Sequence, residues 1–156
     1  MTKALSATNP PHKPPTLLPD ISDPVAAPFW AGTQQSRLMM QQCKKCRAIR
    51  WPPAPICPEC LTPGGEWGEL SGRGTVWSYA VYHRGFHADF VGRVPYVVLL
   101  VALAEGPHMI SSLPEGASAS DIAIGAPVTA RYTQIAPGVS LVQFGPSSGE
   151  LSKPPA

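Results

Sequence analysis

All four cysteines of this 156-residue chain fall into two pairs with the same internal spacing. Cys43 and Cys46 form one Cys-x2-Cys knuckle, and Cys57 and Cys60 form a second after ten intervening residues. This spacing lets each pair turn both sulfurs toward one point, and two pairs supply the four thiolates of a closed tetrahedral zinc site. Because protein ligands fill every position, the pattern predicts a metal that holds structure together and does not catalyse.

Two other uses of the cysteines are open, namely two disulfides or four separate buried thiols. Disulfides need an oxidising compartment. The residues from Met1 to Thr16 carry Lys, His and four prolines, without the apolar run of a secretory signal. We therefore expect a cytoplasmic protein with zinc at the four thiolates, although iron also accepts such ligands.

The composition indicates a small protein with few long helices and no membrane span. Twenty prolines gather at both ends and around the knuckles, which disfavours long helices. The longest apolar run, Val94 to Ala104, has the length of a strand and is too short to cross a bilayer. The formal net charge of +2 is too small to indicate nucleic acid by itself.

Composition and turn residues divide the chain into five segments. We expect a disordered proline-rich arm over 1–19, a short helical segment over 20–37, a metal ribbon over 38–68, a barrel over 69–146 and a loose tail over 147–156. Asp23 before Pro24 predicts the helix start. Phe29 and Trp30 are large apolar residues on a helix too short to have its own core. They must pack on the rest of this chain or dock on a partner.

The segment after the ribbon has the signals of a small antiparallel barrel. Five strands are expected, over 75–83, 94–104, 108–113, 127–135 and 139–144. The run over 94–104 is apolar enough for a strand buried on both faces. With one longer connection before the fourth strand, this order suits a Greek-key barrel of the OB type. The predicted fold class is therefore mostly β: a short N-terminal helix, a four-cysteine zinc ribbon and a small OB-fold barrel.

Several motifs follow one another in the order found in one known family. They are Pro28-Phe29-Trp30, the two knuckles with Pro52-Pro53 between them, Glu66-Trp67, Ser71-Gly72-Arg73-Gly74-Thr75-Val76, Pro95-Tyr96-Val97-Val98 and Gly125-x-Pro127-Val128. On these motifs, the chain from Asp20 to Pro146 resembles an acyl-CoA-associated family in which a rubredoxin-like zinc ribbon precedes an OB-fold. Many ribbons share the cysteine spacing, so the other motifs carry the resemblance. Arg47 departs from the family, which usually has glycine after the first knuckle, and a positive φ there would be strained.

The resemblance implies an accessory subunit that is not catalytic alone. Members of the family work with thiolase-fold enzymes, including acetoacetyl-CoA thiolase with hydroxymethylglutaryl-CoA synthase, lipid-transfer-type thiolases and retro-aldolases of steroid side-chain degradation. Others are fused to MaoC-type hydratases or work beside them. In such complexes the enzyme supplies the catalytic residues, while the ribbon–barrel subunit shapes the CoA site and holds the assembly together. The resemblance thus predicts a thiolase-fold partner, with acyl-CoA at the shared interface.

The loop from Arg84 to Arg93 is the candidate contact with this partner and its CoA. Arginine attracts the CoA phosphates, and Arg73, Arg84 and Arg93 are expected near the barrel mouth. Phe86 and Phe90 are large apolar residues on a loop, where such groups usually have a partner or a ligand. In the alternative, both rings fold back over the barrel end and the arginines are solvated. A stand-alone acyl-CoA binder would use the same residues.

Independent catalysis fits the residues less well. It would need a nucleophile beside a base. His83 and His87 can approach Asp89, yet the cysteines are committed to metal and the Gly-x-Ser-x-Gly motif is absent.

Nucleic-acid binding is the alternative from a different functional class. Its candidate surface is a basic patch on the ribbon formed by Lys44, Lys45, Arg47 and Arg50. A single-strand site also needs aromatic side chains interleaved with basic ones. The aromatic residues between Trp77 and Tyr82 have no Lys or Arg among them, which argues against this use.

Overall fold

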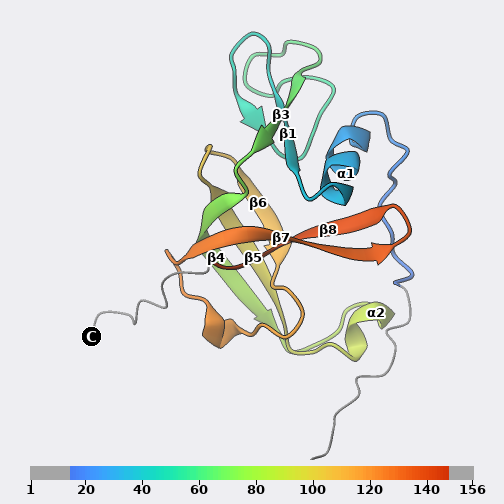
Figure 1. Cartoon of the computed structure of the whole chain (residues 1–156), viewed down its shortest axis with the longest axis vertical. Helices are drawn as coiled ribbons and strands as arrows, with labels where there is room; N and C mark the ends of the chain where they lie inside the picture. The colour runs from blue at the N-terminus through green and yellow to red at the C-terminus, as the bar shows by residue number, and fades with distance from the viewer. Residues whose placement is uncertain (1–14, 148–156) are drawn as a thin grey trace, which may run out of the picture.

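The computed structural model describes residues 15–147 of the chain (Figure 1). The first 14 residues of the expected arm and residues 148–156 of the expected tail lie outside the described residues. Helix α1 (Ala27–Gln34) follows a turn at Asp23. The Asp23 carbonyl accepts a hydrogen bond from Ala27 N at 2.7 Å, and its carboxylate accepts one from Val25 N at 2.9 Å. The Asp-Pro signal therefore marks a turn, and the helix itself begins later than expected.

A three-stranded antiparallel sheet carries the cysteine knuckles. Strands β1 (Leu38–Gln42), β2 (Ile49–Arg50) and β3 (Glu66–Leu70) lie in the order β2-β1-β3. β1 pairs with β3 along its whole length, from Leu38 opposite Leu70 to Gln42 opposite Glu66. This sheet forms the upper part of Figure 1, with the knuckle loops beyond it.

The remaining five strands form the barrel. They are β4 (Arg73–Tyr82), β5 (Tyr96–Leu103), β6 (His108–Ser112), β7 (Pro127–Ala136) and β8 (Val139–Pro146), in the order β6-β5-β4-β7-β8. Side chains close the gap between the two outer strands. Ser111 Oγ donates to Val142 O at 2.8 Å, and Gln143 Nε2 donates to Leu113 O at 2.8 Å. The expected zinc-ribbon and OB-barrel architecture is confirmed.

Two short helical turns lie in the barrel connections. Helix α2 (Ala88–Val91) occupies the β4–β5 loop, which sequence reasoning treated as irregular. A 3₁₀ turn over Ala119–Asp121 lies in the longer connection before β7. Strand β5 also differs from the expectation of burial on both faces, because its buried residues alternate with half-buried ones.

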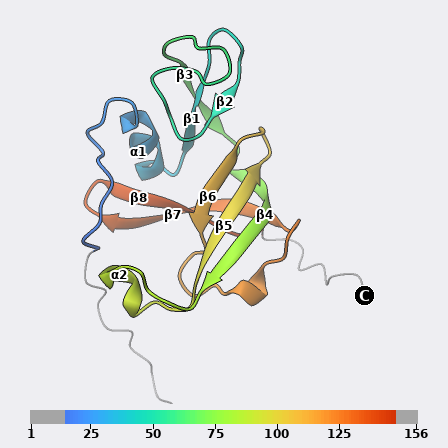
Figure 2. The ribbon, with the colours of Figure 1, turned by 180° about the vertical axis from the view of Figure 1, so that it is seen from behind.

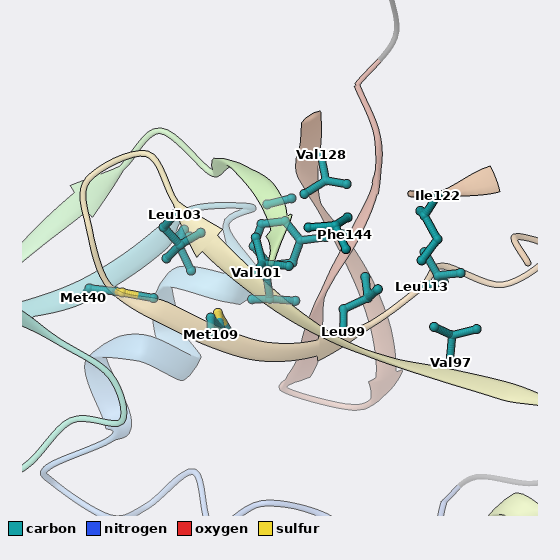
Figure 3. Close-up of a cluster of buried hydrophobic side chains, with 14 of the residues drawn as sticks. Met40, Val97, Leu99, Val101, Leu103, Met109, Leu113, Ile122, Val128 and Phe144 are labelled. Atoms are coloured by element: carbon teal, nitrogen blue, oxygen red, sulfur yellow. The ribbon is translucent and has the colours of Figure 1, made fainter. Parts of the chain in front are cut away.

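One apolar core runs through the barrel and reaches the ribbon. Figure 3 shows Leu99 and Val101 of β5 close to Phe144 of β8, and all three are essentially buried. Met40 of β1 and Met109 of β6 belong to the same cluster. Helix α1 packs against β1 and β8, as the view from behind also shows (Figure 2). The ribbon and the barrel are therefore joined by shared packing.

Among residues 15–147, no helix is long and apolar enough to cross a membrane.

Candidate metal centre and docking loop

The two cysteine knuckles have the same backbone geometry. In the first, Cys43 N donates to Ala48 O at 2.9 Å and Arg47 N donates to Cys43 O at 3.1 Å. In the second, Cys57 N donates to Thr62 O and Leu61 N donates to Cys57 O, both at 2.9 Å. Each knuckle is thus a closed turn that presents both of its sulfurs to the other knuckle.

The four sulfurs form one cluster, all within 4.8 Å of one another. Cys43 Sγ lies 3.5 Å from Cys60 Sγ, and Cys46 Sγ lies 3.6 Å from Cys57 Sγ. A tetrahedral ion with metal–sulfur bonds of about 2.3 Å separates its sulfurs by about 3.8 Å, whereas a disulfide requires about 2.05 Å. All four cysteines are free, so the cluster fits a four-thiolate metal site and does not fit the disulfide alternative.

The thiols of this cluster compete for ionisation. The side chain and backbone of Thr62 lower the pKa of Cys60 to about 6. A backbone hydrogen bond from Ala48 favours the Cys46 thiolate, yet desolvation and the neighbouring cysteines raise the pKa of Cys46 to about 12. Four thiolates at this spacing therefore need a cation among them to balance their charge.

Both knuckles end in a residue with a left-handed backbone. Arg47 has φ 64° and Leu61 has φ 59°. The positive φ suspected at Arg47 is therefore present, and the ribbon turn forms despite it. The cost of this conformation for residues with a Cβ is about 1–2 kcal/mol each.

Arg50 lies beneath the knuckles and links three parts of the ribbon. Its Nε donates to Gln41 Oε1 at 2.8 Å, and one terminal nitrogen donates to Ala54 O at 3.0 Å and Gly64 O at 2.7 Å. Only 6% of Arg50 is exposed. Sequence reasoning assigned Arg50 to a surface basic patch, and that assignment is wrong because burial commits its guanidinium to the ribbon.

The rest of the basic patch is partly neutralised. Lys44 Nζ lies 3.9 Å from a Glu66 carboxylate oxygen, and an Arg47 nitrogen lies 3.7 Å from the other. Without Arg50, and with this acidic neighbour, the patch is a weak candidate for phosphate contacts.

The β4–β5 loop carries an exposed aromatic cluster. Tyr82 at the end of β4 stacks on Tyr96 at the start of β5, with ring centroids 5.1 Å apart and an interplanar angle of 5°. Phe86 makes an edge contact with Tyr82 at 6.0 Å, and Phe90 lies 4.8 Å from Tyr96. Phe86 is nevertheless 72% exposed and Phe90 37% exposed. We call these four residues the aromatic tip.

Sequence reasoning missed the tyrosine half of the aromatic tip. Tyr82 and Tyr96 face each other in the β4–β5 register. The sequence could have predicted this pair, because Tyr82 and Tyr96 lie on either side of one loop, near the ends of two adjacent expected strands. Their stacked rings form a platform, which Phe86 and Phe90 contact from the loop.

Asp89 anchors the N-terminal segment to this loop. Its carboxylate accepts hydrogen bonds from Thr16 N at 2.8 Å and Leu17 N at 3.3 Å. His87 caps α2 by accepting a hydrogen bond from Asp89 N at Nδ1, 3.3 Å away. Nδ1 accepts this hydrogen bond and so carries no proton. The 3.5 Å distance between His87 Nδ1 and Asp89 Oδ2 is therefore not an ion pair. The expected approach of His87 to Asp89 thus serves the loop structure.

The three candidate arginines do not converge. Arg73 begins β4 and pairs with Thr129, at the end of the barrel nearest the ribbon. Arg84 follows the other end of β4, with its guanidinium carbon 5.8 Å from the Phe86 ring centroid. Nine residues of extended strand, about 30 Å, separate Arg73 from Tyr82. Arg93 lines a cleft at the aromatic tip end. Arg73 therefore lies at the other end of β4 from Arg84, and the three arginines do not share one barrel mouth.

The helix residues Phe29 and Trp30 pack within the chain. Phe29 is 2% exposed, and its ring centroid lies 4.2 Å from that of Trp51. Trp30 is half-buried and makes an edge contact with Phe29 at 5.0 Å. The intrachain alternative accounts for Phe29, which has no surface to offer a partner.

A cleft of about 800 Å³ opens beside the aromatic tip. Tyr96 and Val97 of β5, Val81 of β4 and Leu141 of β8 contribute its apolar wall, and Ser118 contributes a hydroxyl. Its volume lies within the range of small-molecule sites in proteins.

Family comparisons assign both halves of the chain. Residues 30–64 match the domain described as "ChsH2, rubredoxin-like zinc ribbon domain". Residues 67–133 match "ChsH2, C-terminal OB-fold domain".

Curated relatives include two proteins named as hydratase alpha subunits. A "Probable enoyl-CoA hydratase alpha subunit" from Thermomonospora curvata is 38% identical over 120 residues, which cover 76% of this chain and 37% of the relative. A "3-oxo-4,17-pregnadiene-20-carboxyl-CoA hydratase alpha subunit" from Mycobacterium tuberculosis is 35% identical over 143 residues, 85% of this chain and 44% of the relative. The chain therefore spans less than half the length of these two relatives.

Shorter relatives match over more of their length. A "DUF35 domain-containing scaffold protein" from Methanocaldococcus jannaschii is 33% identical over 95 residues, 60% of this chain and 66% of the relative. A solved chain of the "Ltp2-ChsH2(DUF35) aldolase" is 36% identical, with a TM-score of 0.72, and the match covers 83% of this chain and 98% of that one. On these matches and the shared ribbon–barrel structure, the chain belongs to the ChsH2 (DUF35) family of zinc-ribbon and OB-fold proteins.

Proposed function

We propose that this chain is a non-catalytic accessory subunit of a cytoplasmic thiolase-fold enzyme that makes or breaks a carbon–carbon bond in an acyl-CoA. The observation that carries the proposal is the aromatic tip, whose Phe86 is held on a tyrosine platform and yet is 72% exposed. Rigid, exposed aromatic residues are typical anchors of protein interfaces. Relatives named as hydratase subunits, as a scaffold and as part of an aldolase support an enzyme partner.

The metal in this proposal is zinc, and its role is structural. Four thiolates leave no coordination position for water or substrate, so the ion would tie the two knuckles together. Apart from the cysteines, residues 43–65 bury no apolar side chain, and metal binding would supply folding free energy that packing does not.

The cleft beside the aromatic tip supports a place for part of the acyl-CoA at the shared interface. Its lining combines apolar residues such as Val97 and Leu141 with neutral donors and acceptors such as Ser118 and Thr133, and with the charged residues Arg93 and Glu115. This mixed lining suits an arm that carries both apolar groups and amides. The same cleft favours a second candidate function, in which the chain binds an acyl-CoA without an enzyme partner.

The test is a reconstituted complex. Tagged wild-type chain is used to recover its partner from the native cell extract, and mass spectrometry identifies a protein recovered at stoichiometric yield. A purified thiolase-fold partner is then assayed for acyl-CoA cleavage with and without this chain. We expect the chain to increase turnover or partner stability while showing no activity alone. Recovery of a MaoC-type hydratase instead of a thiolase-fold enzyme would show that the proposed partner is wrong. Recovery of nucleic acid without either enzyme would refute the proposal.

Variants connect this assay to the aromatic tip. Phe86→Ala with Phe90→Ala should keep the fold and weaken the complex by tenfold or more, because two apolar anchors are truncated. Ile124→Ala is the matched control, because Ile124 is 69% exposed and lies outside the tip. Wild-type affinity in the double variant would move the interface elsewhere on the molecule.

A further inference from the structure

Strand β4 has one edge that is only partly paired. β5 pairs with β4 along its length, from Gly74 to Tyr82. On the other edge, β7 pairs only with Arg73 to Thr75. The chain near Gly125 and Ala126 adds two hydrogen bonds at Val76, of 2.8 and 3.0 Å. Within residues 15–147, no strand pairs with this edge from Ser78 to Tyr82. We call this stretch the open edge.

The side chains along the open edge are exposed on both faces of the sheet. Tyr79 and Val81 lie opposite Leu99 and Val97, whose side chains are in the core, but they remain 37% and 36% exposed. β7 begins at Pro127 opposite Thr75 and runs from there toward Arg73, so it never lies beside this stretch. On this face, Val81 lines the cleft that the connection over 114–120 also borders.

The open edge also lacks the features that keep edge strands apart. Soluble proteins protect free edges with charged residues, proline or bulges. From Ser78 to Tyr82 the sequence is Ser-Tyr-Ala-Val-Tyr, with no charge and no proline. The one irregularity in the β4–β5 pairing lies earlier, between Val76 and Ser78. Strands of this kind add a further strand when one is offered.

We infer that the open edge is a homodimer interface, in which β4 pairs antiparallel with β4 of a second copy of this chain. A two-fold axis near Tyr79 would join the sheets of the two barrels through equivalent residues. Such an interface is isologous, so each copy supplies the edge that the other needs.

A second copy fits the open edge on grounds of charge and hydrogen bonding. The edge presents unpaired backbone donors and acceptors, and β4 of another copy presents the same groups in the matching antiparallel order. Because the stretch is uncharged, bringing two copies together causes no like-charge repulsion. Cross-strand pairs of aromatic and β-branched residues, which Tyr79, Val81 and Tyr82 can form, add to the stability of such sheets.

The test measures the mass of the purified, zinc-loaded full chain by light scattering across the micromolar concentration range. We expect the mass to rise from that of one chain to that of two. Backbone amides over 77–82 should gain protection from hydrogen exchange as the dimer forms. A single-chain mass at every concentration, or growth beyond two chains without a plateau, would overturn the inference.

Variants separate pairing at the edge from non-specific association. Val81→Lys places a charge on the open edge in both copies and should weaken the dimer by about tenfold or more. Ile110→Lys is the control, because Ile110 is 69% exposed on β6 and away from the edge. Circular dichroism checks that both variants fold. Equal weakening by the two variants, or a dimer whose amides over 77–82 stay unprotected, would refute pairing through β4. No enzyme partner is present in this experiment, so the dimer is measured apart from the proposed function, although the open edge shares Val81 with the cleft and Tyr82 with the aromatic tip.

Discussion

The barrel and the ribbon contain similar antiparallel strands, but different interactions hold them together. The barrel buries apolar residues from every one of its strands, including Val76, Leu99 and Phe144. Between the first and last knuckle, the buried residues are Cys43, Arg50 and Cys57. The barrel is therefore stabilised by apolar packing that reaches β1, whereas the four-cysteine cluster and a buried guanidinium connect the rest of the ribbon. A small unit can be ordered without a core of its own when its ligands and hydrogen bonds converge on a few points.

Removal of the metal should give the largest difference in stability between the ribbon and the barrel. Cys43→Ala removes one thiolate, and we expect loss of bound zinc, measured by elemental analysis, with loss of exchange protection over residues 43–65. Structural zinc contributes an apparent 10–16 kcal/mol in small ribbons, about as much as a whole domain's stability. The barrel amides of β5 should stay protected. Glu59→Gln is the control, since Glu59 is exposed and not a ligand. Metal-free Cys43→Ala protein with an ordered ribbon would contradict the structural role.

Truncation of a side chain in the apolar core should destabilise the barrel and the ribbon together. Phe144 is fully buried, so Phe144→Ala should lower the free energy of unfolding by about 3–5 kcal/mol. The measurement is denaturant unfolding of zinc-loaded protein, with Ile124→Ala as a surface control expected within about 0.5 kcal/mol of wild type. Because Met40 of β1 belongs to the same core, the ribbon should lose stability together with the barrel. If the ribbon kept full stability in this variant, the two regions would not share packing.

A smaller effect is expected at the knuckle turn. Arg47→Gly relieves a φ of 64° and should raise the free energy of unfolding by about 0.5–1 kcal/mol, after the greater freedom of glycine in the unfolded chain is counted. Loss of the exposed Arg47–Glu66 contact should cost little. Lys45→Gly, which relieves no positive φ, should be destabilising. Equal effects of the two substitutions would show that the turn stores no strain.

The smallest effect should be a pH dependence of the N-terminal anchor. Desolvation opposes ionisation of Asp89, yet hydrogen bonds from Thr16 and Leu17 hold its pKa below the ordinary value. A lowered folded-state pKa means that the anchor is fully present above the ordinary aspartate range. It is lost as the pH falls through the folded-state pKa. Exchange of the Thr16 and Leu17 amides should therefore increase in acid, and Asp89→Asn should show this faster exchange already at neutral pH.

Much of this architecture could be predicted because its signals are local. The cysteine spacing determines the knuckles, and the alternation of turns and strand-forming residues indicates the five barrel strands. The burial of Arg50 could not be read from sequence, because its partners at Gln41, Ala54 and Gly64 come together only in the folded ribbon. The separation of Arg73 from Arg84 could have been inferred, since ten strand residues place their ends far apart.

The open edge of β4 was beyond sequence reasoning for a different reason. Strand propensity is the same for a paired and an unpaired edge, so Thr75 to Tyr82 reads as an ordinary central strand. The start of β7 at Pro127, opposite Thr75, decides where pairing on this edge stops. The position of that start depends on how the longer connection over 113–126 crosses the barrel, which no local pattern specifies.

The hydrogen bonds of Arg50 have a consequence for changes in chain length. One side chain joins β1 through Gln41 to the loop after β2 at Ala54 and to the loop before β3 at Gly64. The length of the segment from Ala54 to Gly64, which contains the second knuckle, is therefore constrained by its two hydrogen bonds to Arg50. Surface loops usually tolerate insertions, but one added residue between Ala54 and Gly64 would move a carbonyl away from the guanidinium and leave a buried charge poorly solvated. Variation in length should consequently be tolerated at the β4–β5 loop more readily than between Ala54 and Gly64.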